Sequence, residues 1–239
     1  MTYRMAGSTA LVTGSTSGIG AAIATTLAGR GVNVLVCGRD PDRGKSTVEQ
    51  IRRDGGRADF VRADLGSGAE AAEDLATRAR ERAGGAIDIL INNAAVGSMG
   101  PTAKFPVEQY NTVIATNLTA PYYLVGLLAP AMVDAGRGAI VNVSSIASKL
   151  AMPGMSVYGA TKAALEFLTR SWAAEYGPSG VRVNAVVVGP TRTPGSRELG
   201  EGLDILAAQA PAGRVADPVE IALAVAFLVS DSASFIAWR

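Results

Sequence analysis

The sequence predicts an α/β protein, a single domain over residues 1–239 built on a doubly wound parallel sheet. Three observations predict this class. Short β-branched runs alternate with longer helical segments, as in parallel strands joined by right-handed helical crossovers. The predicted strands are nearly continuous apolar runs, as expected for strands buried on both faces. A chain of 239 residues with 48% hydrophobic and 18% charged residues suits one well-filled core.

The first part of the chain contains two strand–helix units. Residues 10–13 form a short buried strand, which a glycine-rich turn connects to a helix over about 18–30. Residues 33–37 form the next strand, and a helix follows over about 41–54. In both units a short β-branched run precedes a longer helical segment, which is typical of βαβ units.

The middle of the chain continues the alternation. The third strand covers residues 59–62, and a surface helix rich in Ala, Glu and Arg covers about 68–82. The fourth strand covers 87–91, and a long helical region extends over about 107–134. Two glycines directly after that region provide its stop signal.

The last part of the chain adds two more strands. Residues 139–143 form the fifth strand, and the next helix extends to about residue 176, where a Gly-Pro pair ends it. Residues 181–188 form the sixth strand, and a helix covers 219–230. The elements together predict a Rossmann-type sheet with helices on both faces. Residues 195–211, rich in Gly and Ala, are the best candidate for a mobile flap over a site.

The composition excludes several kinds of site. A net charge of +1 without a block of like charges argues against a nucleic-acid surface or an anionic-membrane surface. The apolar stretch at 118–133 is short for a bilayer and contains two prolines, so we interpret it as a core helix. One cysteine, Cys37, and no visible secretory signal predict a reducing, cytoplasmic location. The chain contains no histidine, so we expect no metal site, and acid/base chemistry must use Tyr, Lys, Asp, Glu or Ser.

A glycine-rich turn connects the first strand to the first helix. In this context Gly14 permits a tight turn, Gly18 lets the backbone approach a pyrophosphate, and Gly20 lets the helix pack against the sheet. Free N–H groups at the start of the helix then face the phosphates. The sequence therefore predicts a dinucleotide site here, although glycines in a loop are often only turn residues. The other turn residues that we assign to the cofactor are Ser15, Ser17 and Ile19.

The end of the second strand bears on the choice between NADP(H) and NAD(H). An acidic residue near this position would bind the ribose 2′-hydroxyl of NAD, whereas an arginine accommodates the 2′-phosphate of NADP. Gly38 occupies the strand end and Arg39 follows it. A guanidinium is well shaped to hold a phosphate, so we prefer NADP(H) over NAD(H). The alternative is that Arg39 is a solvated loop residue and Asp40 meets the ribose.

Tyr158 and Lys162 are the strongest candidates for acid/base chemistry. Four residues apart on a helix, they lie one turn apart on the same face. A tyrosine of pKa about 10 exchanges protons poorly near neutrality, and a neighbouring ammonium lowers that pKa. Lowering it by about three units needs about 4 kcal/mol of differential stabilisation. An isolated pair of this kind would more often be an aromatic residue with a lysine extending along a helix, so the interpretation depends on the other motifs.

The other motifs of the chain are specific in combination: Thr13-Gly-x-x-x-Gly-Ile-Gly20, Asp64-Leu65, Asn92-Asn-Ala-Ala95, Asn117, Ser145, Tyr158-x-x-x-Lys162 and Gly189-Pro-Thr-Arg-Thr193. With this set the chain resembles the short-chain dehydrogenase/reductase family along nearly its whole length. The resemblance implies that Tyr158 is the general acid in carbonyl reduction and the general base in the reverse direction. It also implies that Lys162 lowers the pKa of Tyr158 and binds the nicotinamide ribose.

The resemblance implies two further catalytic residues. Ser145 would hold the substrate oxygen; two nearby serines compete on sequence alone, and the family spacing selects Ser145. Asn117 would position a water in a proton relay to Lys162. The resemblance also implies further cofactor contacts at the carboxyl ends of strands. Asp64 and Leu65 would lie near the adenine, Asn92 and Ala94 on the ribose side, and Gly189, Thr191 and Thr193 near the nicotinamide. For Asn92, a strand-end cap is an equal alternative.

Three positions depart from the family pattern. Ala95 stands where the family has glycine, and Val188 precedes Gly189 where the family has Pro-Gly. Family members continue after the last helix into a strand that ends in Asp-Gly-Gly, whereas this sequence stops at residues 234–239, so the final strand is missing or replaced. We expect the sixth strand to be a sheet edge, with weaker stability or altered assembly. The prediction is a homo-oligomer, a dimer and not a tetramer.

The sequence thus predicts an NADP(H)-dependent oxidoreductase that interconverts a carbonyl and a secondary alcohol. Apolar residues within 146–157 suggest a hydrophobic substrate, although they could equally pack against helices. One alternative is a reductase of 3-oxoacyl thioesters. Another, of a different class, is a non-catalytic module that senses NADP; a complete set of Asn117, Ser145, Tyr158 and Lys162 argues against it, because a sensor needs no proton donor.

Overall fold

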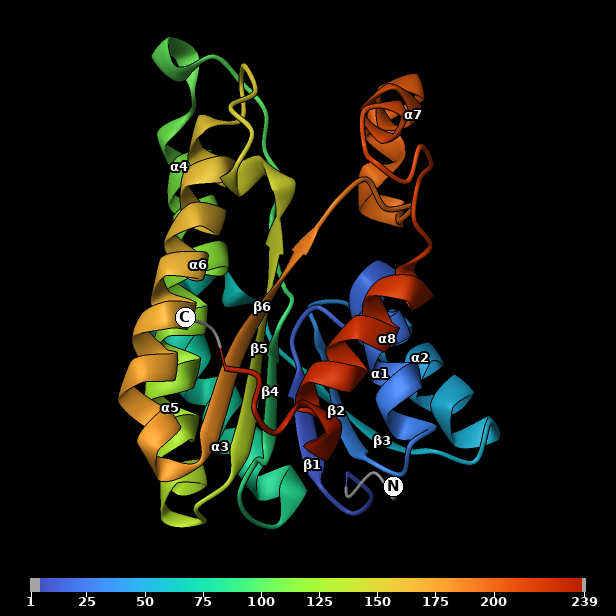
Figure 1. Ribbon diagram of the computed structural model, residues 1–239, viewed down its shortest axis with the longest axis vertical. Coiled ribbons are helices and arrows are strands. Elements are labelled where there is room, and N and C mark those ends of the chain that lie inside the picture. Colours follow the sequence, from blue (N-terminus) through green and yellow to red (C-terminus); the bar gives the residue numbers. More distant parts are fainter. Residues whose placement is uncertain (1–4, 238–239) are drawn as a thin grey trace.

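The computed structural model describes residues 5–237 as a layered α/β protein (Figure 1). Its single six-stranded sheet has the order β3-β2-β1-β4-β5-β6, and every pair of neighbouring strands is parallel. This architecture confirms the predicted fold class. The strands are β1 (Thr9–Val12), β2 (Asn33–Gly38), β3 (Arg57–Arg62), β4 (Ile89–Asn92), β5 (Gly138–Ser145) and β6 (Val181–Val188).

Helices cover both faces of the sheet. In Figure 1, α1, α2 and α8 lie on one face and α3, α4, α5 and α6 on the other, while α7 stands beyond the carboxyl ends of the strands. Their bounds are α1 (Gly18–Ala28), α2 (Pro41–Arg53), α3 (Ala69–Ala83), α4 (Val107–Ile114), α5 (Ala120–Asp134), α6 (Ser156–Tyr176), α7 (Glu201–Ala208) and α8 (Pro218–Val229). The strand order reverses between β1 and β4, which is where ligands bind in sheets of this kind.

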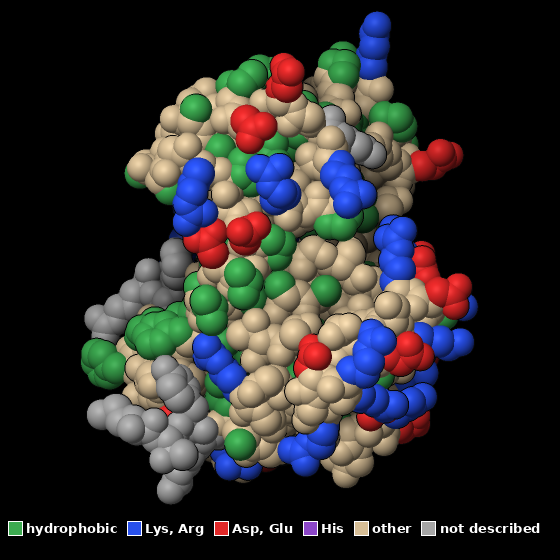
Figure 2. Space-filling model, turned by 90° about the vertical axis from the view of Figure 1, so that its right-hand side faces the viewer, with side chains coloured by type: hydrophobic (Ala, Val, Ile, Leu, Met, Phe, Trp, Pro, Cys, Tyr) green, Lys and Arg blue, Asp and Glu red, His purple; other side chains and the backbone are tan. Residues whose placement is uncertain are grey.

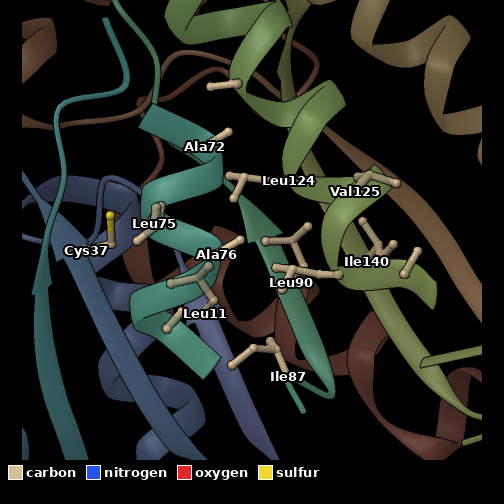
Figure 3. Packing of buried hydrophobic residues seen from close by; sticks show 14 of the residues in the cluster. Leu11, Cys37, Ala72, Leu75, Ala76, Ile87, Leu90, Leu124, Val125 and Ile140 are labelled. Atoms are coloured by element: carbon tan, nitrogen blue, oxygen red, sulfur yellow. The ribbon is translucent and has the colours of Figure 1, made fainter. Parts of the chain in front are cut away.

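Two apolar clusters form the core, one on each side of the sheet. In Figure 3, side chains of α3 lie among side chains of α5 and of the strands; those labelled there are Leu11, Cys37, Ala72, Leu75, Ala76, Ile87, Leu90, Leu124, Val125 and Ile140. The second cluster packs α1, α2 and α8 against the opposite face. Strand residues such as Leu11 and Val12 therefore point into different clusters, which explains why the strands are apolar throughout.

The long helical region predicted at 107–134 is interrupted in its middle. A π-helical turn, Ala115–Thr119, separates α4 from α5. The run Val107–Asp134 is long and apolar enough to cross a membrane by length and composition alone, yet half of its most apolar window is buried in the protein. It packs against α3 and α6, as a core helix does.

The C-terminal part bears on two predictions, the mobile flap at 195–211 and the missing strand after the last helix. The flap predicted at 195–211 contains a 3-10 helix, Pro194–Leu199, and α7, because Thr193 and Ser196 form a capping box that starts the first of them. After α8, residues 230–237 contain no strand, and in the described chain β6 pairs only with β5. Instead, Nδ2 of Asn184 on β6 donates to the carbonyl of Ile236 at 2.8 Å. Residues 238–239 lie outside the described residues.

Candidate active site

The turn between β1 and α1 has the backbone conformation that its glycines predict. Gly14 and Gly18 have φ of 62° and 53°, in the left-handed region that favours glycine. A Cβ on Gly20 would lie 2.2 Å from the carbonyl oxygen of Gly14, so only glycine lets the helix start this close to the turn. Ser17 precedes α1, and among the described residues its side chain makes no capping hydrogen bond. The first N–H groups of α1 are therefore not capped by Ser17 and can serve an anion.

Thr13 and Asn93 fix this turn to the end of β4. The Thr13 hydroxyl accepts from the backbone N–H groups of Asn93 and Ala94, both at 3.0 Å. In return, Nδ2 of Asn93 donates to the carbonyls of Thr13 and Gly14 at 2.9 and 3.0 Å. The sequence motifs contained both residues, but only their neighbours were given roles. These bonds hold the cradle in shape before any ligand arrives.

Two residues assigned to the cofactor have side chains that serve the protein's own structure. The fully buried Ser15 hydroxyl donates to the carbonyl of Val12 at 2.6 Å and accepts from the N–H of Cys37 at 2.9 Å, so it links β1 to β2. The buried Asn92 amide donates to Oδ1 of Asn142 at 2.9 Å, which links β4 to β5. Both side chains are thus hydrogen-bonded inside the sheet and do not point beyond the carboxyl ends of the strands, where a cofactor would lie. This arrangement agrees with a structural role for Asn92, the alternative to a cofactor contact.

The end of β2 is closed to an acidic side chain. A Cβ on Gly38 would lie 2.6 Å from Cγ2 of Thr16, so a larger residue there requires Thr16 to shift. Asp40, the alternative ribose ligand, accepts hydrogen bonds from the N–H groups of Asp42 and Arg43 at the start of α2. The bond from Arg43 is the main cause that lowers the pKa of Asp40. Its carboxylate is thus used as a helix cap.

Arg39 and Arg62 lie side by side at the ends of β2 and β3. Both side chains are exposed, and Nε of Arg62 donates to the carbonyl of Arg39 at 3.2 Å. Within residues 5–237, no carboxylate forms an ion pair with Arg39. The strand ends therefore carry two guanidinium groups, of which sequence reasoning found only one. Arg62 could have been found from its place as the last residue of β3.

The next two predicted contacts, Asp64 and Leu65, lie directly after β3. The Asp64 carboxylate accepts from the N–H of Gly66 at 3.1 Å and caps a short 3-10 helix. Leu65 is buried in the core cluster on the α3 side. Asp64 is exposed at the sheet edge, so it can meet a ligand there, whereas the Leu65 side chain faces the core.

The loop after β6 approaches the glycine turn. A Cβ on Gly18 would lie 3.2 Å from Cβ of Thr193, so the two segments nearly touch. Thr191 forms an isolated parallel bridge with Ala216, and its hydroxyl donates to the carbonyl of Gly189 at 3.0 Å. The predicted nicotinamide-side residue Thr193 thus lies beside the start of α1, and Thr191 is fixed within the loop and to Ala216.

Tyr158, Lys162 and Ser145 come together at the carboxyl end of β5. The Ser145 hydroxyl lies close enough to the Tyr158 hydroxyl to lower the pKa of that phenol. Lys162 is 2% exposed, and its Nζ donates to the carbonyl of Val143 at 2.8 Å. The same Nζ lies 5.7 Å from the centre of the Tyr158 ring. The helical spacing thus brings the ammonium to the face of the phenol, as one turn of α6 predicts.

The electrostatics differ from the sequence-based expectation. Burial raises the pKa of Tyr158 above 10.0, and the neighbouring Ser145 hydroxyl offsets only part of that rise. Burial also lowers the pKa of Lys162 from 10.5 to about 8. The expected lowering of the Tyr158 pKa by Lys162 is therefore wrong for the protein alone, because burial raises that pKa and the side chain that lowers it is Ser145, not Lys162.

Asn117 belongs to the π-helical turn between α4 and α5. Its Oδ1 accepts from the N–H of Val96 at 2.8 Å, and its Nδ2 donates to the Val96 carbonyl at 3.1 Å. Nδ2 also reaches the Thr161 hydroxyl at 3.3 Å, next to Lys162 on α6. Asn117 thus joins the loop after β4 to the helix that carries the acid/base pair. A π-bulge at a functional site is a frequent arrangement.

A bound dinucleotide fits these residues. The turn at Gly14, Gly18 and Gly20 is packed so closely against Ala94, Thr193 and its own backbone that side chains there would clash, and Ser17 leaves the first N–H groups of α1 uncapped. Such a cofactor would supply the hydride, and its phosphates would lie on the turn. The carboxyl ends of β1, β4, β5 and β6 then carry a complete set of groups: an anion cradle, a hydroxyl pair and a buried ammonium.

Comparisons with known proteins agree with this arrangement. A family model described as short chain dehydrogenase matches residues 8–204. Cis-4-hydroxycyclohexanecarboxylate dehydrogenase of Sinomonas cyclohexanicum is 41% identical over 237 residues, 95% of this chain and 91% of that protein. A solved structure of a short chain dehydrogenase/reductase family protein has a TM-score of 0.88 and 46% identity, and covers 98% of this chain and 94% of that one.

A further solved structure holds a cofactor. Angucycline C-6 ketoreductase LanV with bound NADP has a TM-score of 0.89 and 36% identity to this chain, with coverage of 98% of this chain and 92% of that one. The family match spans most of the sequence, and the relatives align over nearly their full length. The chain therefore belongs to the short-chain dehydrogenase family of NAD(P)-dependent oxidoreductases, which act on alcohols and ketones.

Proposed function

We propose that this protein is an NADP(H)-dependent oxidoreductase that interconverts a secondary alcohol and a ketone, with Tyr158 as the acid/base group. The observation that carries the proposal is the meeting of Tyr158, Ser145 and Lys162 at the carboxyl end of β5, beside the glycine turn. A protein that only senses a nucleotide has no need of a partly buried phenol next to a serine hydroxyl and a buried ammonium.

Each side chain has a distinct task in this proposal. Ser145 holds the substrate oxygen, and Tyr158 donates its proton to that oxygen during reduction. Because burial raises the pKa of Tyr158, the phenol remains protonated at neutral pH and is ready to act as the acid. Lys162, fixed by the Val143 carbonyl, supports the charge that develops on the phenol and binds the cofactor ribose.

The choice of NADP(H) is supported by the strand ends of β2 and β3. Position 38 is a glycine beside Thr16 and carries no carboxylate, and Asp40 is occupied as the cap of α2, so neither offers a carboxylate to a ribose 2′-hydroxyl. Arg39 and Arg62 instead offer guanidinium groups, which bind phosphate well. LanV, which is similar to this chain, is described with bound NADP.

For the substrate we propose an alcohol or ketone on an apolar ring. Two of the relatives act on a hydroxycyclohexane carboxylate and on an angucycline, as their names state. Leu150 is exposed in the segment after β5, and Leu199 and Ile205 are exposed around α7, so apolar side chains are available near the strand ends. A 3-oxoacyl thioester belongs in the same substrate panel as a competitor.

The cofactor preference is tested by measuring dissociation constants for NADPH and NADH side by side. We expect wild type to bind NADPH more tightly. The Arg39→Ala variant loses a charge-assisted contact, so it should bind NADPH about tenfold more weakly and NADH as before. Arg53→Ala, which alters an exposed arginine at the other end of α2, is the matched control. An Arg39→Ala variant with unchanged NADPH affinity would contradict the assignment.

The catalytic role is tested with the preferred cofactor and a panel of cyclic ketones. Tyr158→Phe removes the proton donor, so turnover should disappear while cofactor binding persists. Lys162→Ala should damage both turnover and binding, because its ammonium serves the phenol and the ribose. Near-normal turnover in the phenylalanine variant would remove Tyr158 from its role.

A further inference from the structure

Glu166 is a buried carboxylate on α6 that the proposed mechanism does not use. Its side chain is 2% exposed, and it lies one turn after Lys162 on the face of α6 that packs on the sheet. A buried carboxylate is costly unless hydrogen bonds and an opposite charge compensate for its lost hydration. Its contacts therefore need an explanation, and all of them lead to one segment, Ser144–Lys149.

Three side chains of that segment hold the carboxylate. The Ser144 hydroxyl donates to Oε1 at 2.7 Å, and the Ser148 hydroxyl contacts the same oxygen. Nζ of Lys149 lies 2.5 Å from Oε2 in an ion pair. Burial raises the pKa of Glu166, but the bonds from Lys149, Ser148 and Ser144 together outweigh it and keep the pKa below its ordinary value. The carboxylate is thus ionised at neutral pH and binds its three partners as an anion.

These three partners flank Ser145 on both sides. Besides contacting Glu166, the Ser148 hydroxyl lies 2.7 Å from the carbonyl of Ser145. The Ser145 hydroxyl accepts from the N–H of Ala147 at 3.2 Å, inside the same short turn, and lies close enough to the Tyr158 hydroxyl to lower the pKa of that phenol. The direction of the Ser145 hydroxyl therefore depends on the shape of a turn whose neighbours are tied to Glu166.

We propose that Glu166 is a positioning residue for the reaction: it holds the Ser144–Lys149 segment so that the Ser145 hydroxyl stays within reach of the Tyr158 hydroxyl. The inference rests on the proposed function, in which Ser145 holds the substrate oxygen. α6 thereby fixes both members of the hydroxyl pair, Tyr158 directly and Ser145 through Glu166. The helix presents Tyr158, Lys162 and Glu166 at intervals of one turn, so all three reach the end of β5.

The test compares Glu166→Gln and Ser148→Ala with wild type. The glutamine keeps an oxygen acceptor but loses the ion pair with Lys149, and the alanine removes one of the three partners without changing Glu166. Small displacements of a reacting group cost large factors in rate, so we expect Glu166→Gln to lower kcat about tenfold or more. Ser148→Ala should lower it in the same direction. The KM for NADPH should change little, because the glycine turn lies on other elements and Lys162 is held by the carbonyl of Val143, not by Glu166. Glu175→Gln, an exposed glutamate on the same helix, is the control.

Hydrogen exchange measured by mass spectrometry provides a readout that is independent of activity. The N–H groups of Ala147, Lys149 and Leu150 are bonded within the turn, to the Ser145 hydroxyl and to the Ile146 carbonyl. In Glu166→Gln they should exchange faster than in wild type, while peptides from the rest of α6 keep their protection. Faster exchange throughout α6, with kcat per NADPH-binding site unchanged, would show a purely structural role and overturn the inference.

The outcomes separate this inference from the proposed function. An active wild type with unchanged kcat in both variants overturns the positioning role alone, as does an unchanged exchange pattern in the turn. A wild type that binds NADPH but reduces no carbonyl in the panel overturns the proposed function, and with it the catalytic part of this inference. A loss of kcat together with faster exchange confined to the turn supports both.

Discussion

Lys162 places a positive charge where little water can reach it. Burial lowers its pKa to about 8 from 10.5, so between these values the folded protein binds fewer protons at this site than the unfolded chain. Stability therefore rises with pH across this interval, by up to about 3 kcal/mol for this one group. Below about pH 8 the lysine is charged in both states, and the cost of burying its charge is present in full.

The prediction is tested by urea denaturation between pH 8 and pH 10. The free energy of unfolding of wild type should rise with pH relative to that of Lys162→Met, which has no charge to bury. Tyr158 has a raised pKa, so it lowers stability from about pH 10 upward, where the unfolded phenol ionises, and it is present in both proteins that are compared. Two curves that run parallel from pH 8 to pH 10 would show that the lysine is better solvated than the structure indicates.

At the residue scale, the sequence predicts which side chains meet in the site better than it predicts their pKa shifts. The spacing of Tyr158 and Lys162 predicts their contact, because a helix fixes which side chains are neighbours. The spacing cannot predict whether the pKa of Tyr158 is raised or lowered, because the burial of the phenol in the folded protein decides this. In the same way, Asn92 and Asn93 are adjacent and identical, yet one links two strands inside the sheet and the other holds the glycine turn.

At the element scale, the glycine turn packs so closely against the end of β2 that Thr16 leaves little room for a side chain at Gly38. A Cβ on Gly38 would lie 2.6 Å from Cγ2 and 2.9 Å from Oγ1 of Thr16, but 3.3 Å from its Cβ. Gly38→Ala should therefore lower the free energy of unfolding by about 1–3 kcal/mol, the usual cost of overpacking. The same substitution should cost much less in a Thr16→Ala background, where the two closest atoms are gone.

A double-mutant cycle with both substitutions measures this coupling by urea denaturation. The control is Gly55→Ala in the loop after α2. A Cβ on Gly55 would have no atom of the described chain within 4 Å, but the φ of this residue is 83°. The cost of that substitution therefore comes from backbone strain and should be independent of Thr16. Equal costs of Gly38→Ala in both backgrounds would contradict this close packing against Thr16.

The elements themselves follow from the sequence to different degrees. Strands and their parallel pairing are predictable, because apolar runs between helices admit few other arrangements. The π-helical turn at Ala115–Thr119 is not, since one extra residue in a turn has no compositional signal, although it decides where Asn117 points. The helices within 194–208 were not predicted, because the small residues there suggested only a mobile flap, whereas the Thr193–Ser196 capping box starts a helix.

At the scale of the whole molecule, two helix faces expose apolar side chains. On the α5–α6 side, Tyr122 and Phe167 are 52% and 62% exposed, and they line a shallow hollow of about 500 Å³ together with Tyr123 and Leu168. On α8, three exposed residues follow one another at intervals of four: Val219, Leu223 and Phe227. Figure 2 shows that the face carrying α1, α2 and α8 bears acidic and basic side chains interspersed, without one dominant sign. Such charges do not oppose contact between identical copies.

We propose that the protein is a dimer that pairs α5 and α6 of one copy with those of the other. Exposed aromatic side chains on this face are Tyr122, Tyr123 and Phe167, and Tyr122 packs against Tyr123 and Trp172 at ring-centre distances of 5.7 and 6.2 Å. Aromatic residues are enriched at such interfaces. On the α8 side, in contrast, β6 is a free sheet edge in the described chain, because no further strand pairs with it.

In sedimentation velocity, wild type should therefore migrate as a dimer, and Phe167→Asp as a folded monomer, because a carboxylate would be buried without a partner. Phe227→Asp on α8 is the matched control and should remain a dimer. A wild-type tetramer that Phe227→Asp reduces to a dimer would show instead that the α8 face also pairs, and that an open β6 edge does not prevent it.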